Sequence, residues 1–503
     1  MRPTFLGFEA SKSALYASQK ALDITGNNLA NMYSEGYTRQ RVDQVSVAYT
    51  RYSNRGYRNA VGLSGQGTNV IGVGQTRDKQ LDNAFRQQCS EIGGFSQRSA
   101  MLSDIESALQ EFDIGDSGNG YGLRNAISNL YNSLQDFTAD AGSPTYATVA
   151  ADAFTKLAST IREMNTSLEN TAVKYKGSLE TDVSDINDYL QQLADLNKDI
   201  KDALGSTDYT EEYGPNDLLD KRNVILDKLS TYGEISVKNN SDGTTDVSFG
   251  GRKVVNGTTA DALEYSENSD GTVSVKWKSD GSDADTGVGI LKSTVSILNG
   301  RGPKIQNSTE SAEKGILYYK DKLDTFTKRL VAVCNTTIPE ETDAQGNVTK
   351  YKKLFGAEGA DGEVYTDMHT TSENIWVSKD LENDINYLLN KDGADSDNSY
   401  VLALVAKLSN TKFDFDGVNA TFEDFITDYT TKLGSDLSYA NNGYDAAVKA
   451  GNVIDDSRNS VTGVSETEET TSMLTYNRAF QAASRMMTVM DDLLDVLINQ
   501  MAV

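Results

Sequence analysis

Both ends of the chain carry the apolar periodicity of a long amphipathic helix. Near the N-terminus an apolar residue recurs at every seventh position, at Phe8, Leu15, Leu22 and Leu29. A second stripe of small and branched residues runs beside it and consists of Ala14, Ala17, Ala21 and Ile24. This spacing predicts a helix over residues 4–32 that a partner helix can approach closely.

The C-terminal stretch carries a longer seam, in which apolar residues alternate at spacings of three and four. Its members are Met473, Tyr476, Phe480, Ala483, Met487, Met490, Leu494, Leu497 and Met501. This is the a/d pattern of a coiled coil. Ser465 followed by Glu468 forms a capping box, which predicts where the helix begins. Neither terminal helix can bury its stripe alone, so we expect either an ordinary helix hairpin at the edge of a domain or a polymerisation device.

Helical periodicity also dominates the region between the ends. The predicted helices cover residues 79–112, 123–139, 145–204, 215–232, 308–335 and 421–455. The longest has a seam of its own, which predicts an antiparallel coiled-coil arm. That seam consists of Leu168, Ala172, Tyr175, Leu179, Val183, Ile186, Leu190 and Leu193. Residues 37–77 are rich in Gly, Val, Thr and Tyr, which indicates short strands or an extended arm.

The pattern changes between residues 233 and 291, where β-branched residues alternate with polar ones. Ser-Asp-Gly turns at 241–243, 269–271 and 279–281 separate these runs, as in antiparallel hairpins. Residues 336–415 are mixed in pattern and rich in Asp and Gly.

Together these patterns predict a mainly α fold with an inserted antiparallel β-domain. We expect residues 1–40 with 465–503 to form paired, coiled-coil-like terminal helices. Residues 41–232 with 301–335 and 416–464 would form a helical, rod-like domain with a long helical arm. Residues 233–300 would form an outward, β-rich domain, and 336–415 a mixed, irregular part of the outer region.

Composition narrows the classes of partner. Lys plus Arg total 47 against 73 Asp plus Glu, and the formal net charge of −26 argues against nucleic acid or an anionic membrane surface. Two cysteines, Cys89 and Cys334, form no disulfide framework, and two unpaired thiols are favoured. No early apolar run has the length of a secretory signal, and none approaches the ~18 residues of a membrane span.

Residues suited to catalysis or metal binding are sparse. His369 is the single histidine, so no histidine-based metal cluster can be assembled in one chain. The Asp-Gly turns lack EF-hand spacing, and no phosphate-binding glycine loop, nucleophile elbow or zinc-protease motif occurs. Glu466, Glu468 and Glu469 suit the positive end of the terminal helix dipole. The sequence therefore predicts a protein that is not an enzyme, with no catalytic, cofactor-binding or metal-binding residues and no cofactor.

Both terminal sequences resemble a known family. ALDITGNNLANMYSEGYTRQRV, from Ala21, resembles the N-terminal motif of the bacterial flagellar axial proteins of rod, hook and hook–filament junction. VTGVSETEETTSMLTYNRAFQAASRMMTVMDDLLDVLINQM, from Val461, is similar to the C-terminal motif of that family. The segments NDLLDKRNVILDKLS from Asn216 and DNSYVLALVAKL from Asp397 resemble its hook-associated, junction-forming members.

The resemblance implies a structural subunit of the bacterial flagellum that serves cell motility and flagellum assembly. In this family the terminal helices line the channel of a tubular polymer, and the β-domain faces outward. The implied partners are further copies of the chain, the hook protein, the next junction protein toward the filament, and an export chaperone. The implied location is the extracellular flagellum, reached by type III export without a cleaved signal peptide. Two alternatives are a hook or distal-rod axial protein and a flagellum-displayed enzyme or adhesin.

The expected assembly interface combines the two seams with polar positions of the N-terminal motif. Its residues are Phe8, Leu15, Leu22, Asn27, Asn28, Leu29, Asn31, Gly36, Tyr37, Tyr476, Phe480, Gln481, Met487, Met490, Leu494 and Leu497.

Overall fold

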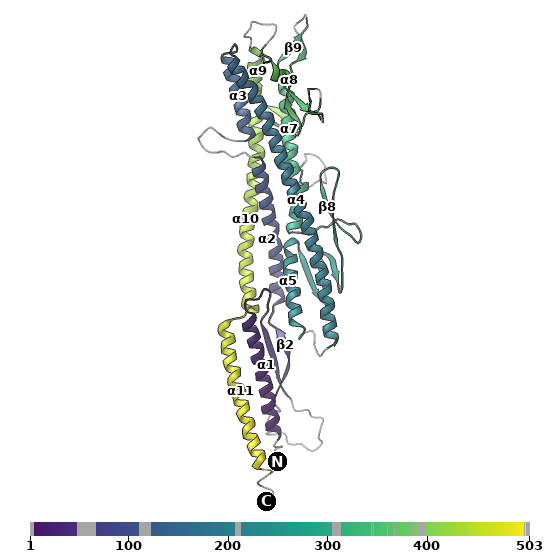
Figure 1. Ribbon diagram of the computed structural model, residues 1–503, viewed down its shortest axis with the longest axis vertical. Coiled ribbons are helices and arrows are strands. Elements are labelled where there is room, and N and C mark those ends of the chain that lie inside the picture. The colour runs from purple at the N-terminus through teal and green to yellow at the C-terminus, as the bar shows by residue number, and fades with distance from the viewer. Residues whose placement is uncertain are drawn as a thin grey trace.

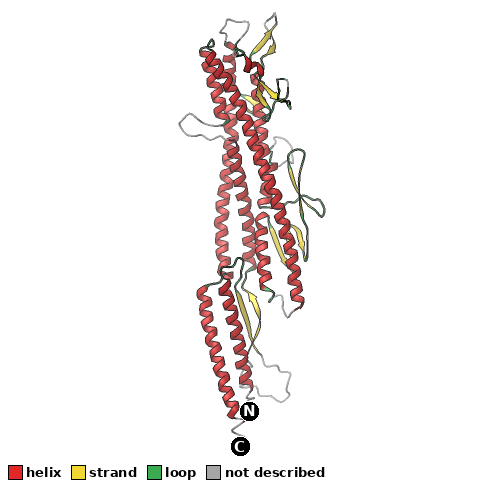
Figure 2. Cartoon of the chain, viewed as in Figure 1, coloured by secondary structure: helices red, strands yellow, loops and turns green. Residues whose placement is uncertain are grey.

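The chain forms an elongated molecule with both termini at the same end (Figure 1). The computed structural model describes residues 5–47, 67–109, 122–206, 213–303, 313–343, 345, 347–359, 361–366, 368–384, 386–389, 398–496 and 498. A short body made by the two terminal helices and one hairpin continues into a longer helical rod. Small sheets lie along one side of the rod and near its far end (Figure 2).

The terminal body contains two helices and two strands. They are α1 (Phe5–Asn31), α11 (Glu466–Asp495), β1 (Gln40–Ser46) and β2 (Thr68–Gln75). The two strands pair antiparallel, from Gln40 opposite Gln75 to Ser46 opposite Thr68. The helix predicted over 4–32 and the strands predicted within 37–77 are thereby confirmed. The Ser465 hydroxyl accepts a hydrogen bond from the Glu468 N–H, so the terminal helix begins where the capping box placed it.

Six helices make up most of the rod. They are α2 (Lys79–Leu109), α3 (Leu123–Ala139), α4 (Pro144–Ser206), α5 (Asn216–Tyr232), α7 (Ile316–Cys334) and α10 (Phe422–Thr462). The α2 and α10 helices run side by side in opposite directions. Their backbones approach closely where Gly443 faces the ring of Phe95 and Gly451 faces Ile92. Glycine at these positions leaves room for the facing side chains.

The 63-residue α4 helix is the spine of the rod, roughly 95 Å long. Of its predicted seam, Ala172 is half-buried and the other seven residues are buried. The predicted antiparallel coiled-coil arm is wrong in one respect, because α4 has a succession of partners. Along its length it contacts α3, α2, α5, α6 (Ile290–Asn299) and α7. A long apolar stripe specifies burial, but it does not specify a single partner helix.

The inserted β-region is antiparallel, as predicted. One sheet has the order β3-β4-β5-β6, and β7 pairs with β8 in a second. These strands are β3 (Ile235–Asn239), β4 (Thr245–Phe249), β5 (Arg252–Asn256), β6 (Thr259–Ala260), β7 (Leu263–Glu267) and β8 (Val273–Trp277). Gly243 and Gly271 adopt φ of 80° and 81° at the turns, and the preceding Asp carboxylates accept hydrogen bonds from Thr244 and Thr272. The Ser-Asp-Gly motifs are therefore hairpin turns.

The described elements between α7 and α10 are short. They are β9 (Pro339–Thr342), β10 (Val348–Tyr351), β11 (Phe355–Glu358), β12 (Val364–Tyr365), β13 (Ile375–Val377), α8 (Lys379–Asn383), α9 (Ser399–Asn410), β14 (Phe413–Phe415) and β15 (Val418–Ala420). They form three small antiparallel sheets with α8 and α9 beside them. The mixed pattern of residues 336–415 matches this arrangement.

Two helix boundaries differ by seven residues or more from the sequence predictions, and one helix was not predicted. The α10 helix continues to Thr462, seven residues beyond the predicted end, through a polar stretch that lacks an apolar stripe. The α7 helix begins at Ile316, whereas the prediction began at 308; residues 308–312 lie outside the described residues, and 313–315 are not helical. The α6 helix was not predicted, because it is only ten residues long and follows the β-region directly. The predicted continuation of α2 over 110–112 lies outside the described residues.

Both cysteines are free thiols, as predicted. Among the described residues, no helix has the combined length and apolar character needed to cross a membrane.

Candidate functional site

The paired terminal helices are the first part of the candidate site. The α1 and α11 helices lie side by side in opposite directions (Figure 1). Their contact is close at Gly7, where an added Cβ would lie 2.6 Å from Cε of Met490. The predicted pairing of the two ends is therefore present within one chain.

The buried centre of this pair consists of small side chains. Where side chains of α1 and α11 are described, the only buried apolar ones are Ala17, Ala21 and Ala483. Ser18 and Thr25 are buried beside them, and their hydroxyls donate to the carbonyls of Ala14 and Ala21 one turn earlier. Because these hydroxyls are satisfied within α1, they can be buried without a partner on the other helix.

The larger apolar residues of both seams are only half-buried. This holds for Phe8, Leu15, Leu22, Leu29, Tyr476, Phe480, Met487, Met490 and Leu494. Gln481 is exposed and donates a hydrogen bond to Asn477 of its own helix. Leu497 and Met501 lie outside the described residues. Within one chain the helix pair therefore covers its seams only in part.

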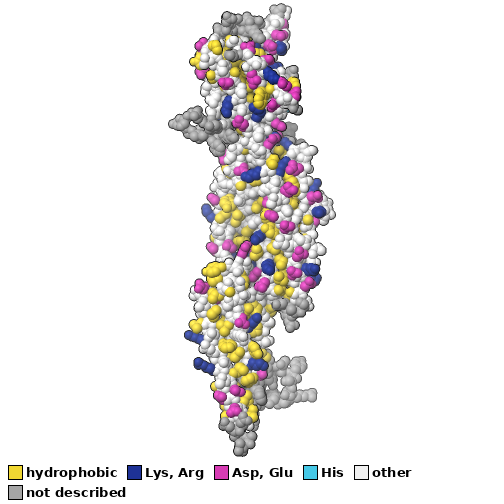
Figure 3. Space-filling model, in the orientation of Figure 1, with side chains coloured by type: hydrophobic (Ala, Val, Ile, Leu, Met, Phe, Trp, Pro, Cys, Tyr) yellow, Lys and Arg dark blue, Asp and Glu magenta, His cyan; other side chains and the backbone are white. Residues whose placement is uncertain are grey.

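A second apolar stripe on α11 and the turn after it is exposed. It consists of Leu474, Met486, Val489, Leu493, Val496 and Ile498, with exposed fractions from 43% to 61%. Figure 3 shows hydrophobic side chains gathered along the lower body that these helices form. An apolar stripe of this length on a terminal helix indicates a surface that other protein covers.

The polar residues of the N-terminal motif tie the end of α1 to the rest of the chain. The Asn28 amide is buried and exchanges two hydrogen bonds with the backbone of Gln40. The Tyr37 hydroxyl donates to Asn28 Oδ1 at 2.8 Å and accepts from Asn27. Asn31 donates to the Asn27 carbonyl and side-chain oxygens. The structure therefore brings four predicted site residues together at the joint between α1 and the first strand.

Gly36 lies in the turn that follows α1. Its φ of 75° is in the left-handed region, and an added Cβ would overlap Val224 of α5 at 2.1 Å. Both conditions require glycine there. This turn therefore places the terminal body in direct contact with α5 of the rod.

Ion pairs link α11 to the same joint. The Arg39 guanidinium contacts Glu468 at 3.1 Å and Glu469 at 2.8 Å. Glu469 is only 2% exposed and also accepts a hydrogen bond from Asn28. These acids thus have a second role beyond the helix dipole, because they hold the start of α11 against the end of α1 and the first strand.

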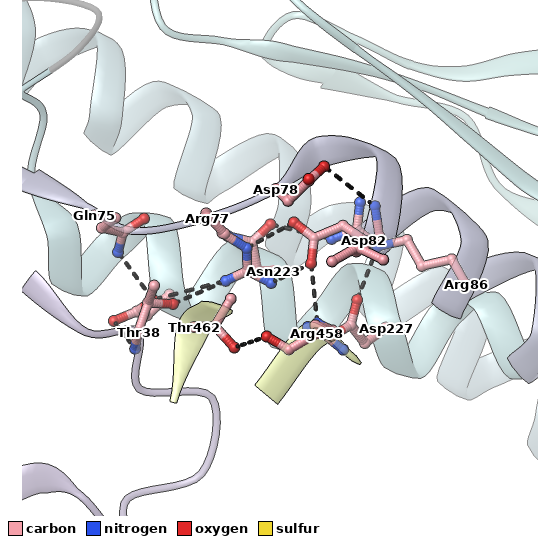
Figure 4. Close-up of polar contacts among 12 residues, drawn as sticks. Thr38, Gln75, Arg77, Asp78, Asp82, Arg86, Asn223, Asp227, Arg458 and Thr462 are labelled. Atoms are coloured by element: carbon pink, nitrogen blue, oxygen red, sulfur yellow. Dashed lines mark hydrogen bonds and ion pairs between the residues drawn. The ribbon is translucent and has the colours of Figure 1, made fainter. Parts of the chain in front are cut away.

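A charged cluster at the base of the rod completes the joint (Figure 4). Asp82 on α2 accepts two hydrogen bonds from Arg77 and forms an ion pair with Arg458 of α10. Asp227 on α5 pairs with Arg86 at 2.8 Å and with Arg458. The cluster therefore joins three helices that are distant in sequence.

The terminal body attaches to this cluster through polar contacts. Arg77 donates to the Thr38 hydroxyl at 2.9 Å, and the Thr38 N–H donates to Asp220 at 3.3 Å. The Arg39 N–H donates to the Thr462 carbonyl at the end of α10. Directional bonds therefore help to fix the orientation of the terminal body relative to the rod.

Electrostatics at the cluster favour the ionised form of Asp82. Burial alone would raise the pKa of this carboxyl, but the hydrogen bonds and charge of Arg77, with Arg458 and Arg86, outweigh it and lower the pKa below 3.8. Removing one partner would leave buried charge uncompensated.

Sequence reasoning missed this cluster. Arg77, Asp82, Arg86 and Asp227 follow no apolar period, and Arg458 lies in the part of α10 that was not predicted as helix. No spacing in the sequence could have shown that these side chains meet. Among the described residues, no group of His, Cys, Asp and Glu could hold a metal ion. The arrangement is suited to holding helices in a fixed relation and to presenting an apolar surface.

Family models match the chain at its middle and at both ends. The model "Flagellar hook-associated protein FlgK helical domain" matches residues 103–355, which are 253 of the 503 residues. "Flagella basal body rod protein" matches residues 8–38, and "Flagellar basal body rod FlgEFG protein C-terminal" matches 456–501.

Individual proteins are also similar to the chain. Flagellar hook-associated protein 1 of Bacillus subtilis (strain 168) is 28% identical over 529 aligned positions, covering 100% of this chain and 99% of the relative. The protein of that name from Salmonella typhimurium (strain LT2) is 27% identical over 252 residues, or 50% of this chain and 42% of the relative. The flagellar hook junction protein FlgK from Burkholderia pseudomallei has a solved structure that covers 56% of this chain and 47% of its own, with 20% identity and a TM-score of 0.41. The chain, whose middle half matches the helical domain and whose two ends match the axial motifs, belongs to the flagellar hook-associated protein family.

Proposed function

We propose that the chain is a subunit of the junction between hook and filament and that it polymerises through its terminal helices. The observation that carries the proposal is the half-covered pair α1–α11 with its exposed apolar stripe. Leu493 and Met486 are about half exposed, and burying one such side chain stabilises a contact by about 1.5–3 kcal/mol. Contacts of a few such residues with neighbouring copies are sufficient to drive assembly.

The proposed assembly interface consists of the two seams and the exposed stripe beside them. Phe8, Leu15, Leu22 and Leu29 would meet Phe480, Met487, Met490 and Leu494 within the chain and in adjacent copies. The terminal helices would then line the channel of a tube, and the β-strands of residues 235–277 would face outward. The rod, which buries its own stripe along α4, would form the layer between them.

A hook or distal-rod subunit is the alternative within the axial family. The rod-type models match only short spans at the two ends. The match over 103–355 is to the hook-associated type, and it includes α3, α4 and α5. The rod domain therefore favours the junction over the hook or the distal rod.

The proposed neighbours are the hook protein on one side and the next junction protein toward the filament on the other, with a chaperone before export. Export would proceed through the flagellar type III apparatus without cleavage. Intact mass measurement of the protein from isolated flagella tests this point. A mass that retains residues 1–20 is expected, and a shortened N-terminus would contradict the export proposal.

The junction role is tested by negative-stain electron microscopy of cells that lack the gene, together with a blot for flagellin in the medium. Bare hooks and flagellin lost to the medium are expected. Absence of hooks would instead favour a rod or hook subunit. Intact filaments would contradict the proposal and return an enzyme or adhesin role to consideration.

A further inference from the structure

A groove lies where the terminal body meets the rod, on the surface of α4 and α5. It has a volume of about 560 Å³. The turn after α1 forms one wall, and the last part of α4 and the first turns of α5 form the others. We call it the acidic groove, and it is lined by Ser34, Glu35, Tyr37, Gln192, Asp195, Leu196, Asp199, Asp217, Asp220, Lys221, Val224 and Ile225.

The acidic groove combines an apolar floor with a negative rim. Leu196, Val224 and Ile225 are half-buried and supply the floor. The lining holds five carboxylates and one lysine, a formal charge of −5 + 1 = −4. Within the described part of the chain, the exposed carboxylates of Asp199 and Asp217 have no ion-pair partner. The groove thus offers unneutralised carboxylates beside apolar surface.

The pKa of Tyr37, which lines the groove, is consistent with negative charge there. Burial raises the pKa of the Tyr37 hydroxyl, and the charges of Asp220, Asp217 and Glu469 raise it further. The part of this shift that comes from the carboxylates reflects negative charge around the hydroxyl, and negative charge favours a nearby cation. A side chain with an aliphatic stem and a guanidinium head matches both the floor and the rim.

The chain itself contains a segment of that chemistry. Residues 48–66, which lie outside the described residues, read AYTRYSNRGYRNAVGLSGQ. They contain Arg51, Arg55 and Arg58 together with three tyrosines, and no acid occurs between Asp43 and Asp78. Elsewhere acids are frequent, since 73 of the 503 residues are Asp or Glu. We call this segment the arginine arm. Its formal charge is positive, whereas the net charge of the whole chain is negative.

The described strands β1 and β2, which flank the arginine arm in the sequence, extend away from the groove of the same chain. The hairpin begins beside the groove, where Gln75 donates to Asp220 at 2.9 Å. It ends at Ser46 and Thr68, six residue steps along β1 from Gln40 and roughly 20 Å distant. A second copy displaced by about this length along the long axis would present its groove to the arm.

We propose that the acidic groove of one copy receives the arginine arm of a neighbouring copy. The inference rests on the proposed function, because only a polymer brings copies into that relation. Bidentate pairs between arginine and carboxylate, with tyrosine rings against the apolar floor, would fix the register of adjacent subunits. The contact adds a polar, orientation-specific interaction to the apolar contact of the terminal helices.

The test is photocrosslinking in assembled flagella of the full chain. A photoreactive benzoylphenylalanine in place of Tyr52 is expected to give an adduct of two chains, mapped by mass spectrometry to peptides spanning 192–225. The double substitution Asp195→Lys with Asp199→Lys should reduce this adduct by about tenfold or more, the change that corresponds to a loss of about 1.4 kcal/mol. The control, Asp188→Lys with Asp202→Lys, changes the charge of exposed α4 residues outside the groove equally and should leave it unchanged.

A charge swap makes the test specific. Replacing the three arginines of the arm by Asp in the Asp195→Lys, Asp199→Lys background should restore the adduct. An adduct confined to one chain, or one mapped to another surface, would overturn the inference. The proposed function is assessed separately, from hooks and flagellin in cells lacking the gene, so a junction protein with a different arm contact would refute the inference alone.

Discussion

The rod helix α4 and the terminal pair α1–α11 carry the same three-and-four spacing of apolar residues, yet they bury them to different extents. In α4, Leu168, Leu179, Ile186 and Leu190 are fully buried within one chain. In the terminal pair the large seam residues remain half-buried, and only alanines are buried among the described apolar side chains. Periodicity therefore predicts a helix and the face it buries, but not whether the covering partner belongs to the same chain.

The difference has an energetic consequence. Burial of a leucine contributes about 1.5–3 kcal/mol, and an alanine contributes much less. The rod buries its large apolar side chains within one chain. Isolated helices are marginal in water, so the terminal pair is expected to gain most of its stability from neighbouring copies.

The largest expected effect is loss of assembly on Leu494→Asp. This change places a charge in the seam of α11 at a cost of several kcal/mol once neighbours cover it. Bare hooks and flagellin in the medium are expected, while the thermal midpoint of the purified monomer stays unchanged. Asn477→Asp adds the same charge at an exposed position of the same helix and should assemble normally. Normal motility of the Leu494→Asp strain would contradict the seam assignment.

Next in size is the effect of Phe326→Ala on the free monomer. Phe326 is fully buried in the rod, 5.4 Å from the ring of Phe422, and its truncation should cost about 3–5 kcal/mol. The matched change Leu22→Ala in α1 should cost less than about 1 kcal/mol in the monomer, because Leu22 is only half-buried there. Urea unfolding measures both. Equal losses in the free energy of unfolding for the two variants would contradict the difference in burial between the rod and the terminal pair.

A smaller effect, about 3 kcal/mol, is expected for Asp82→Asn at the joint, since Arg77 and Arg458 would lose their shared carboxylate. The folded pKa of Asp82 lies below 3.8, so its contribution is present above that value and is lost as the pH falls through the folded pKa. The difference between wild type and variant in urea unfolding should therefore shrink toward acid. The exposed Asp78→Asn removes the same charge and keeps a side chain suited to the start of α2, so it serves as the control. Parallel curves from pH 7 to pH 3 would contradict the assignment.

Much of the fold could be predicted because it follows local patterns. The α3 helix occupies 123–139 as predicted, and the Ser-Asp-Gly turns have the glycine conformations that hairpins need. The joint could not be predicted, because Asp82, Asp227 and Arg458 meet only in three dimensions. The end of α10 was missed for a related reason, since its last residues bind polar partners and carry no apolar stripe. The division into domains and the assembly role of the seam residues remain predictions.

Hydrogen–deuterium exchange of a verified monomer, compared with assembled flagella, tests the central claim most directly. The amides of 7–31 and 466–495 are expected to exchange rapidly in the monomer and to become protected on assembly, while α4 is protected in both. Strong protection of the terminal helices in the monomer would contradict the claim that neighbouring copies supply their stability.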